Sequence, residues 1–201
     1  MRLAIGSLFA AGIALAIAPF ASAHFRLLEP QSWIVENNLG DPQKLGPCGG
    51  TSANGGEPTN MVTKATGGQK LHIKVQETVF HPGHYRVSLA VNSRADLPAD
   101  PQVVTRDGAK GPQSVSAPIQ NPIQMPVLAD GLFPHTAKVE APLETDVTLP
   151  NITCTKCTLQ IVQFMAEHGL NKDGGYYYHH CADLQITADP AKPIDARWNA
   201  R

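Results

Sequence analysis

The sequence predicts an all-β protein, an antiparallel β-sandwich of the immunoglobulin-like or fibronectin-like kind with long loops. Seventeen prolines and seventeen glycines punctuate the 201 residues, and few stretches repeat apolar residues at a helical spacing. Short segments instead alternate apolar and polar residues, which indicates strands with one buried face. Several such strands separated by turn residues are typical of a sandwich.

Five segments are expected to form strands. In the clearest of them, Leu71, Ile73 and Val75 alternate with polar residues, so that one set of side chains faces a core. The segment 138–147 is the weakest candidate because Pro142 interrupts it. The segment 176–186 is aromatic and then apolar, which favours a long strand. The expected bounds are 70–78, 85–91, 138–147, 158–164 and 176–186.

The connecting segments are rich in turn-forming residues. We expect 37–58 to be a loop, and 92–125, which holds five prolines, to be a long loop or a partly disordered insertion. A short turn is expected at 171–175, and the polar tail 189–201 is expected to lie on the surface. Because no internal repeat or second domain is visible, residues 24–201 are expected to form one domain.

The N-terminus has the pattern of a secretory signal peptide. Met1-Arg2 is basic, residues 3–20 are apolar, and Ala21-Ser22-Ala23 is an A-x-A cleavage signal. Residues 1–23 are therefore expected to be removed, which leaves a secreted or periplasmic protein that begins at His24. The apolar run is marginal in length for a membrane span, and no second stretch reaches that length.

The charge balance argues against one class of partner. Sixteen Lys and Arg stand against seventeen Asp and Glu, a formal net charge of −1. No basic stripe runs along the chain, so nothing favours a nucleic-acid partner. We expect a monomer that binds neither nucleic acid nor membrane.

The four cysteines allow two interpretations. An even number in an exported chain favours two disulfide bonds, for which three connectivities are possible. The alternative is a zinc site, because Cys154 and Cys157 have the C-x-x-C spacing. No second C-x-x-C accompanies them, and an oxidising compartment disfavours free thiolates.

A chain that begins at His24 has a chelating group at its first residue. The α-amine and the imidazole of one histidine can bind one metal ion together, and a second imidazole opposite them completes a T-shaped set of three nitrogens. A planar nitrogen set suits Cu(II), and a reduced copper site with open positions suits an oxygenase. The alternative is an ordinary, frayed N-terminus.

Four short motifs carry a family resemblance. They are His24-Phe-Arg-Leu-Leu-Glu-Pro-Gln-Ser32, Phe80-His81-Pro-Gly-His-Tyr-Arg-Val-Ser-Leu89, Cys157-Thr-Leu-Gln160 and Tyr178-His-His-Cys-Ala-Asp-Leu184. With these motifs the chain resembles lytic polysaccharide monooxygenases, and most closely the branch that includes insect enzymes and bacterial monooxygenase-like relatives. The match covers both ends and the middle of the expected mature chain in the family's order.

The resemblance implies a single copper ion and its ligands. His24 and His81 align with the two histidines of the family's copper site, and Tyr178 aligns with the catalytic aromatic residue on the copper axis. His84 falls where the family usually has another residue, so a surface or supporting position is the alternative for it. The alternative for Tyr178 is a core tyrosine of a sandwich strand.

Around the copper the chain departs from the family pattern. Many members place a Gln or Glu near the axial aromatic residue, whereas this chain has Tyr176 two residues before Tyr178. The candidates for residues that surround the ligands are His84, Arg86, Gln163, His168 and Tyr176.

The remaining histidines are assigned other positions. His179 and His180 are adjacent, so in a strand they face opposite sides. His72 and His135 lie in no motif and are expected at the surface. The resemblance also implies a Cys48–Cys181 disulfide between an early loop and the final strand, which leaves Cys154–Cys157 as the second.

The function implied is that of a copper-dependent monooxygenase that oxidatively cleaves glycosidic bonds in an insoluble polysaccharide of the chitin or cellulose type. Its partners are a polysaccharide surface and an electron donor. The alternatives are a non-catalytic exported copper-binding or copper-delivery protein with the same ligands, and a purely structural sandwich. An enzyme needs an exposed face around the site, for which Phe25, Trp33 and Phe133 are the aromatic candidates.

Overall fold

The computed structural model describes residues 23–108, 111–115, 118–166, 168–169 and 176–198. All but the last residue of the expected signal peptide, and the expected turn 171–175, lie outside the described residues. Within the described part the chain consists of strands, loops and short 3-10 helices. No helix there is long and apolar enough to cross a membrane.

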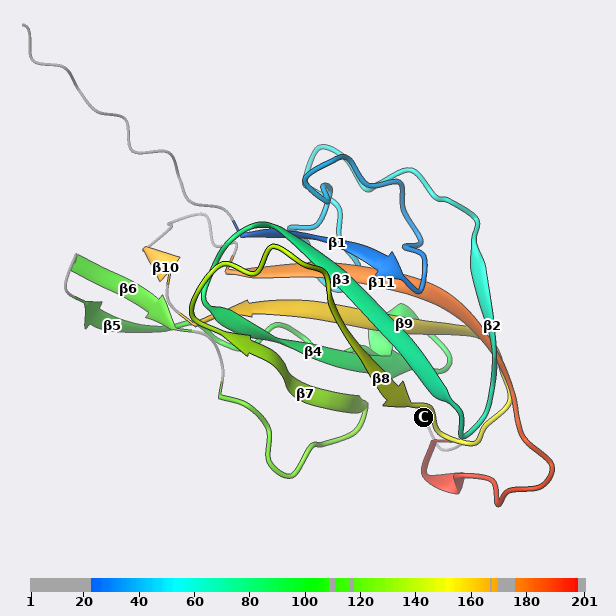
Figure 1. The fold of residues 1–201 in the computed structure, drawn as a ribbon. Helices are drawn as coiled ribbons and strands as arrows, with labels where there is room; N and C mark the ends of the chain where they lie inside the picture. Colours follow the sequence, from blue (N-terminus) through cyan, green and yellow to red (C-terminus); the bar gives the residue numbers. More distant parts are fainter. Residues whose placement is uncertain (1–22, 109–110, 116–117, 167, 170–175, 199–201) are drawn as a thin grey trace, which may run out of the picture.

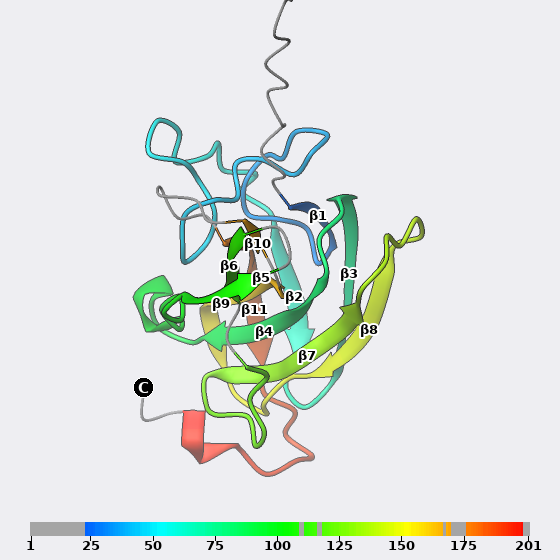
Figure 2. The same cartoon turned by 90° about the vertical axis from the view of Figure 1, so that its left-hand side faces the viewer.

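Two sheets pack face to face, so the protein is an all-β sandwich, as the sequence predicts (Figures 1 and 2). Among the described strands of both sheets the pairings are antiparallel, except that β2 runs parallel to β11. The smaller sheet has the order β1(His24–Glu29), β3(Lys70–Val79), β8(Leu143–Thr148). The larger has the order β2(Val62–Thr66), β11(Tyr177–Thr187), β9(Cys154–Met165), β4(Gly83–Ala90), β7(Val127–His135).

The core lies between the facing surfaces of the two sheets. Phe25 of β1 is fully buried and meets the ring of Tyr85 from β4 edge-on, with the centroids 5.2 Å apart. Burying a side chain of this size stabilises the fold by about 1.5–3 kcal/mol. Alternate residues of each strand supply the rest of this face, among them Ile73, Val75, Val87, Leu89, Leu159, Ile161 and Leu184.

Strand predictions succeeded where apolar residues alternate or run continuously. β3, β4, β9 and β11 each overlap an expected segment. β8 begins at Leu143, directly after Pro142, because proline cannot donate a ladder hydrogen bond. β1, β2 and β7 were not predicted, and β2 is a half-exposed edge strand with no continuous apolar pattern.

The expectation of a loop at 92–125 was only partly right. The segment contains a 3-10 helix, η1(Arg94–Asp96), and a hairpin of β5(Val104–Gly108) and β6(Gly111–Val115). β6 pairs with β10(His168–Gly169), and this small third sheet projects from the end of the sandwich where β1 begins (Figure 1). Most side chains of β5 are exposed, so no burial pattern marked this hairpin in the sequence.

Loops cover the outer face of the larger sheet. The structure has both expected disulfide bonds, Cys48–Cys181 and Cys154–Cys157. The first joins the loop 37–58 to β11, and Gln160 of β9 donates a hydrogen bond to the Pro47 carbonyl at 2.8 Å. The loop that carries the early cysteine is therefore held against the sheet.

Candidate metal centre

The pairing of β1 with β3 sets the positions of the two histidines expected to bind copper. His24, the first residue of β1, lies opposite Val79, the last residue of β3. His81 follows Val79 by two residues, in the connection between β3 and β4. Both histidines are largely buried. The fold thus places them at the same end of the sandwich.

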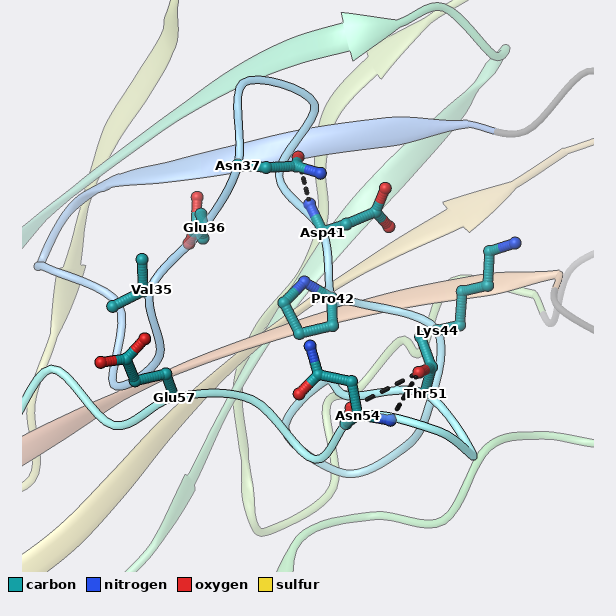
Figure 3. Close-up of a pocket in the computed structure, with 9 residues that line it drawn as sticks. All are labelled: Val35, Glu36, Asn37, Asp41, Pro42, Lys44, Thr51, Asn54 and Glu57. Atoms are coloured by element: carbon teal, nitrogen blue, oxygen red, sulfur yellow. Dashed lines mark hydrogen bonds between the residues drawn. The ribbon is translucent and has the colours of Figure 1, made fainter.

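His24 contacts a loop residue and a strand residue. Its Nε2 lies 3.3 Å from Asp41 Oδ2, and its ring centroid is 5.1 Å from that of Tyr178. Asp41 lines a surface pocket of about 530 Å³ in the loop 35–57 (Figure 3). Within that pocket the Asp41 amide donates to Asn37 Oδ1 at 3.0 Å, which fixes the turn that carries the carboxylate.

His81 is held in the form that binds a metal. Burial, together with the nearby imidazoles of His168 and His24, lowers the pKa of its imidazole to about 4. The ring is therefore neutral at physiological pH, as a metal ligand must be. Its Nδ1 is buried and meets no hydrogen-bond partner of good geometry among the described residues.

Tyr178 and three of the supporting candidates lie on the same side of the sheet as the histidines. Tyr178 is opposite Gln163 in the pairing of β11 with β9, and both side chains are buried. The ring of His168 stacks on that of His81 at 5.2 Å and meets that of Tyr176 edge-on at 5.4 Å. The structure thus brings Gln163, His168 and Tyr176 towards the two histidines.

His84 and Arg86 lie on the opposite face of the larger sheet. His84 is opposite Phe164 in the pairing of β4 with β9. Phe164 follows Gln163 by one residue, so the side chains of these two residues point to opposite faces of the sheet. Arg86 Nη2 donates to Asp130 Oδ2 at 2.7 Å, and its guanidinium lies over the Phe164 ring. His84 Nε2 is 3.7 Å from Asp130 Oδ1. These two residues therefore anchor the outer face and do not contact the candidate ligands.

This buried ion pair leads to a stability prediction. Asp130→Ala leaves the buried guanidinium of Arg86 without its carboxylate, so we expect a loss of about 3–5 kcal/mol in the free energy of unfolding. Urea unfolding measures the difference. Asp146→Ala is the control, because it removes an exposed carboxylate beside His72 and is expected to unfold like the wild type. Equal midpoints for all three proteins would show that the pair contributes nothing.

The structure corrects the expected position of His135. Its side chain is 7% exposed, and Nε2 lies 3.2 Å from Glu77 Oε1. His135 was expected at the surface, and Glu77 was not among the expected site residues. The signal was nevertheless present, because Glu77 continues the inward alternation of Leu71, Ile73 and Val75 and is therefore an acid at a core position.

The other histidines lie where they were expected. His179 faces outwards to Asp100, with 2.6 Å between Nε2 and Oδ1. His180 faces inwards, where its Nε2 is 2.9 Å from the Phe25 carbonyl and its Nδ1 is 3.0 Å from Glu36 Oε1. His72 is exposed on β3.

The aromatic residues expected to form a substrate face do not form one. Phe25 is fully buried in the core, so its expected role is wrong. The indole of Trp33 donates to the Cys48 carbonyl at 2.7 Å and lies under the Arg94 guanidinium. Phe133 is partly buried and packs edge-on against Tyr85.

The donor chemistry fits copper only if the N-terminal amine takes part. In the described part of the chain, no three His, Cys, Asp or Glu side chains are grouped closely enough to hold a metal ion. Two imidazoles and the amine of a cleaved chain would supply three nitrogens, which is a set that suits Cu(II). No protein-family model matches the chain, and no curated protein matches its sequence.

Proposed function

We propose that the protein is an exported copper-dependent monooxygenase that oxidatively cleaves glycosidic bonds in an insoluble polysaccharide of the chitin or cellulose type. The observation that carries this proposal is the pairing of β1 with β3. It sets His24 opposite Val79, two residues before His81, and the Tyr178 ring lies 5.1 Å from that of His24. The two disulfides are compatible with an oxidising compartment.

The proposed roles follow from position and chemistry. His24, through its amine and imidazole, and His81 hold the ion, and Tyr178 shields the site from the core side. When bound, copper would supply the one-electron chemistry that activates O₂ or peroxide with electrons from a reductant. Asp41 holds the His24 imidazole from the loop, in the way that outer carboxylates orient ligand histidines.

Processing of the N-terminus is the first test. We expect N-terminal sequencing of the exported protein to begin at His24. With ascorbate and Cu(II), this mature form is expected to release oxidised oligosaccharides from chitin or cellulose. A matched variant with one extra residue before His24 loses the chelating amine, so it is expected to release none and to bind Cu(II) more weakly in isothermal titration. Unchanged affinity in the extended variant would exclude the proposed site.

A specific observation favours a second function, that of a non-catalytic copper-binding or copper-delivery protein. None of Phe25, Trp33 and Phe133 presents an open aromatic surface beside the site. A carrier needs accessible copper but no surface for a polysaccharide. Tight copper binding that depends on the amine, with transfer of copper to a competing chelator and without oligosaccharide release, would identify the carrier.

A further inference from the structure

Glu77 is a buried acid in a strand that otherwise faces the core with apolar residues. It occupies the inward position after Leu71, Ile73 and Val75, and its side chain is 1% exposed. Burying a carboxylate is costly unless hydrogen-bond donors surround it. The contacts of Glu77 lead to the candidate metal centre.

A single oxygen of Glu77 joins three separate segments. Oε1 accepts a hydrogen bond from the backbone N–H of His81 at 3.1 Å and one from Gln163 Nε2 of β9 at 3.0 Å. His135 Nε2 of β7 lies 3.2 Å from the same atom. The carboxylate thus ties the connection that carries His81 to two strands of the larger sheet.

The position of Glu77 in β3 relates it to both proposed ligands. Val79 lies between Glu77 and His81 in the sequence, and it is also the residue opposite His24. Phe25, the next residue of β1, pairs with Glu77 itself. A movement of the Glu77 contact would therefore alter the placement of His81 relative to the first residue of β1.

We propose that Glu77 is the positioning residue of the copper site, which it serves by fixing the backbone at His81 rather than by touching the metal. This inference rests on the proposed function. Groups that orient metal ligands contribute roughly 10–100-fold to metal affinity. The hydrogen bond from the His81 backbone to Glu77 sets the direction from which the His81 imidazole meets the amine and imidazole of His24.

The test compares two buried carboxylates, of which Glu77 in β3 faces the core between the sheets and Asp130 in β7 contacts the outer-face residue Arg86. Glu77→Ala in the mature protein is expected to lower Cu(II) affinity about 10–100-fold and to change the electron paramagnetic resonance spectrum of the bound ion. Glu77→Gln keeps an oxygen acceptor and is expected to restore part of the affinity. Asp130→Ala is the control, because it also lowers stability but is expected to keep the wild-type spectrum and affinity.

Two results would overturn the inference. One is a folded Glu77→Ala protein with wild-type affinity and spectrum. The other is measured on the wild-type protein loaded with Cu(I). Rapid hydrogen exchange at the His81 amide would show that its hydrogen bond to Glu77 does not form. Failure of the proposed copper site is distinguishable, because Cu(II) affinity would then be unaffected by His81→Ala as well. Failure of the monooxygenase function alone would abolish oligosaccharide release and leave the dependence of Cu(II) affinity on His81 and Glu77 intact.

Discussion

His81→Ala is expected to lower the Cu(II) affinity of the mature protein by more than about 100-fold. Removal of a group that only orients a ligand costs roughly 10–100-fold, and removal of the imidazole itself would exchange one of the proposed nitrogen ligands for water. Burial keeps this imidazole neutral, with a pKa of about 4, so at pH 7 no proton competes with the metal. Isothermal titration with a competing chelator measures the loss.

His84→Ala is the matched control for this prediction. It removes a buried histidine only three residues along the chain, but one that faces Asp130 and stacks on Phe164. We expect it to leave Cu(II) affinity nearly unchanged. Tyr178→Phe is also expected to keep the affinity, because the position proposed for Tyr178 is axial and axial Cu(II) bonds are long and weak. It is expected to alter the electron paramagnetic resonance spectrum instead. Loss of a nitrogen coupling in His84→Ala, with the native coupling kept in His81→Ala, would reverse the assignment of the second ligand.

The sequence predicts the sandwich because its central strands each have one mainly apolar face. Tyr85, Val87 and Leu89 alternate with residues that face the other side, and β4 lies where this alternation indicates. The outer residues of β4 are nevertheless buried too, since loops cover them. Such coverage depends on contacts between distant segments, for example Gln160 with Pro47, and local pattern does not reveal it.

The candidate site was predictable in its motif residues and unpredictable in its supporting contacts. His24 and His81 stand in short motifs, so each can be singled out before the fold is known. The contact of Asp41 with His24 depends on the path of a loop, and that of His135 with Glu77 joins residues far apart in sequence. Arg86 faces away from the site because it alternates with the inward Tyr85 and Val87 of β4, whereas Gln163 lies opposite Tyr85 on β9.

Removal of the Cys48–Cys181 disulfide is expected to have a large effect on stability. The bond closes a loop across 133 residues, for which the chain-entropy model gives about 5 kcal/mol. The covalent link restricts the unfolded chain and also holds the loop that carries Asp41 against β11, which carries Tyr178. We expect the double variant Cys48→Ala/Cys181→Ala to lose about 3–5 kcal/mol of unfolding free energy.

The chain offers a matched control for this disulfide in its second pair. Cys154 and Cys157 are only three positions apart in the sequence, so in the same model their bond contributes only roughly 2 kcal/mol by restricting the unfolded chain. Guanidinium unfolding of the two double variants should therefore give clearly different midpoints, with the Cys48→Ala/Cys181→Ala protein the less stable. Equal losses would show that packing around the sulfur atoms, rather than the length of the closed loop, determines the contribution of each bond.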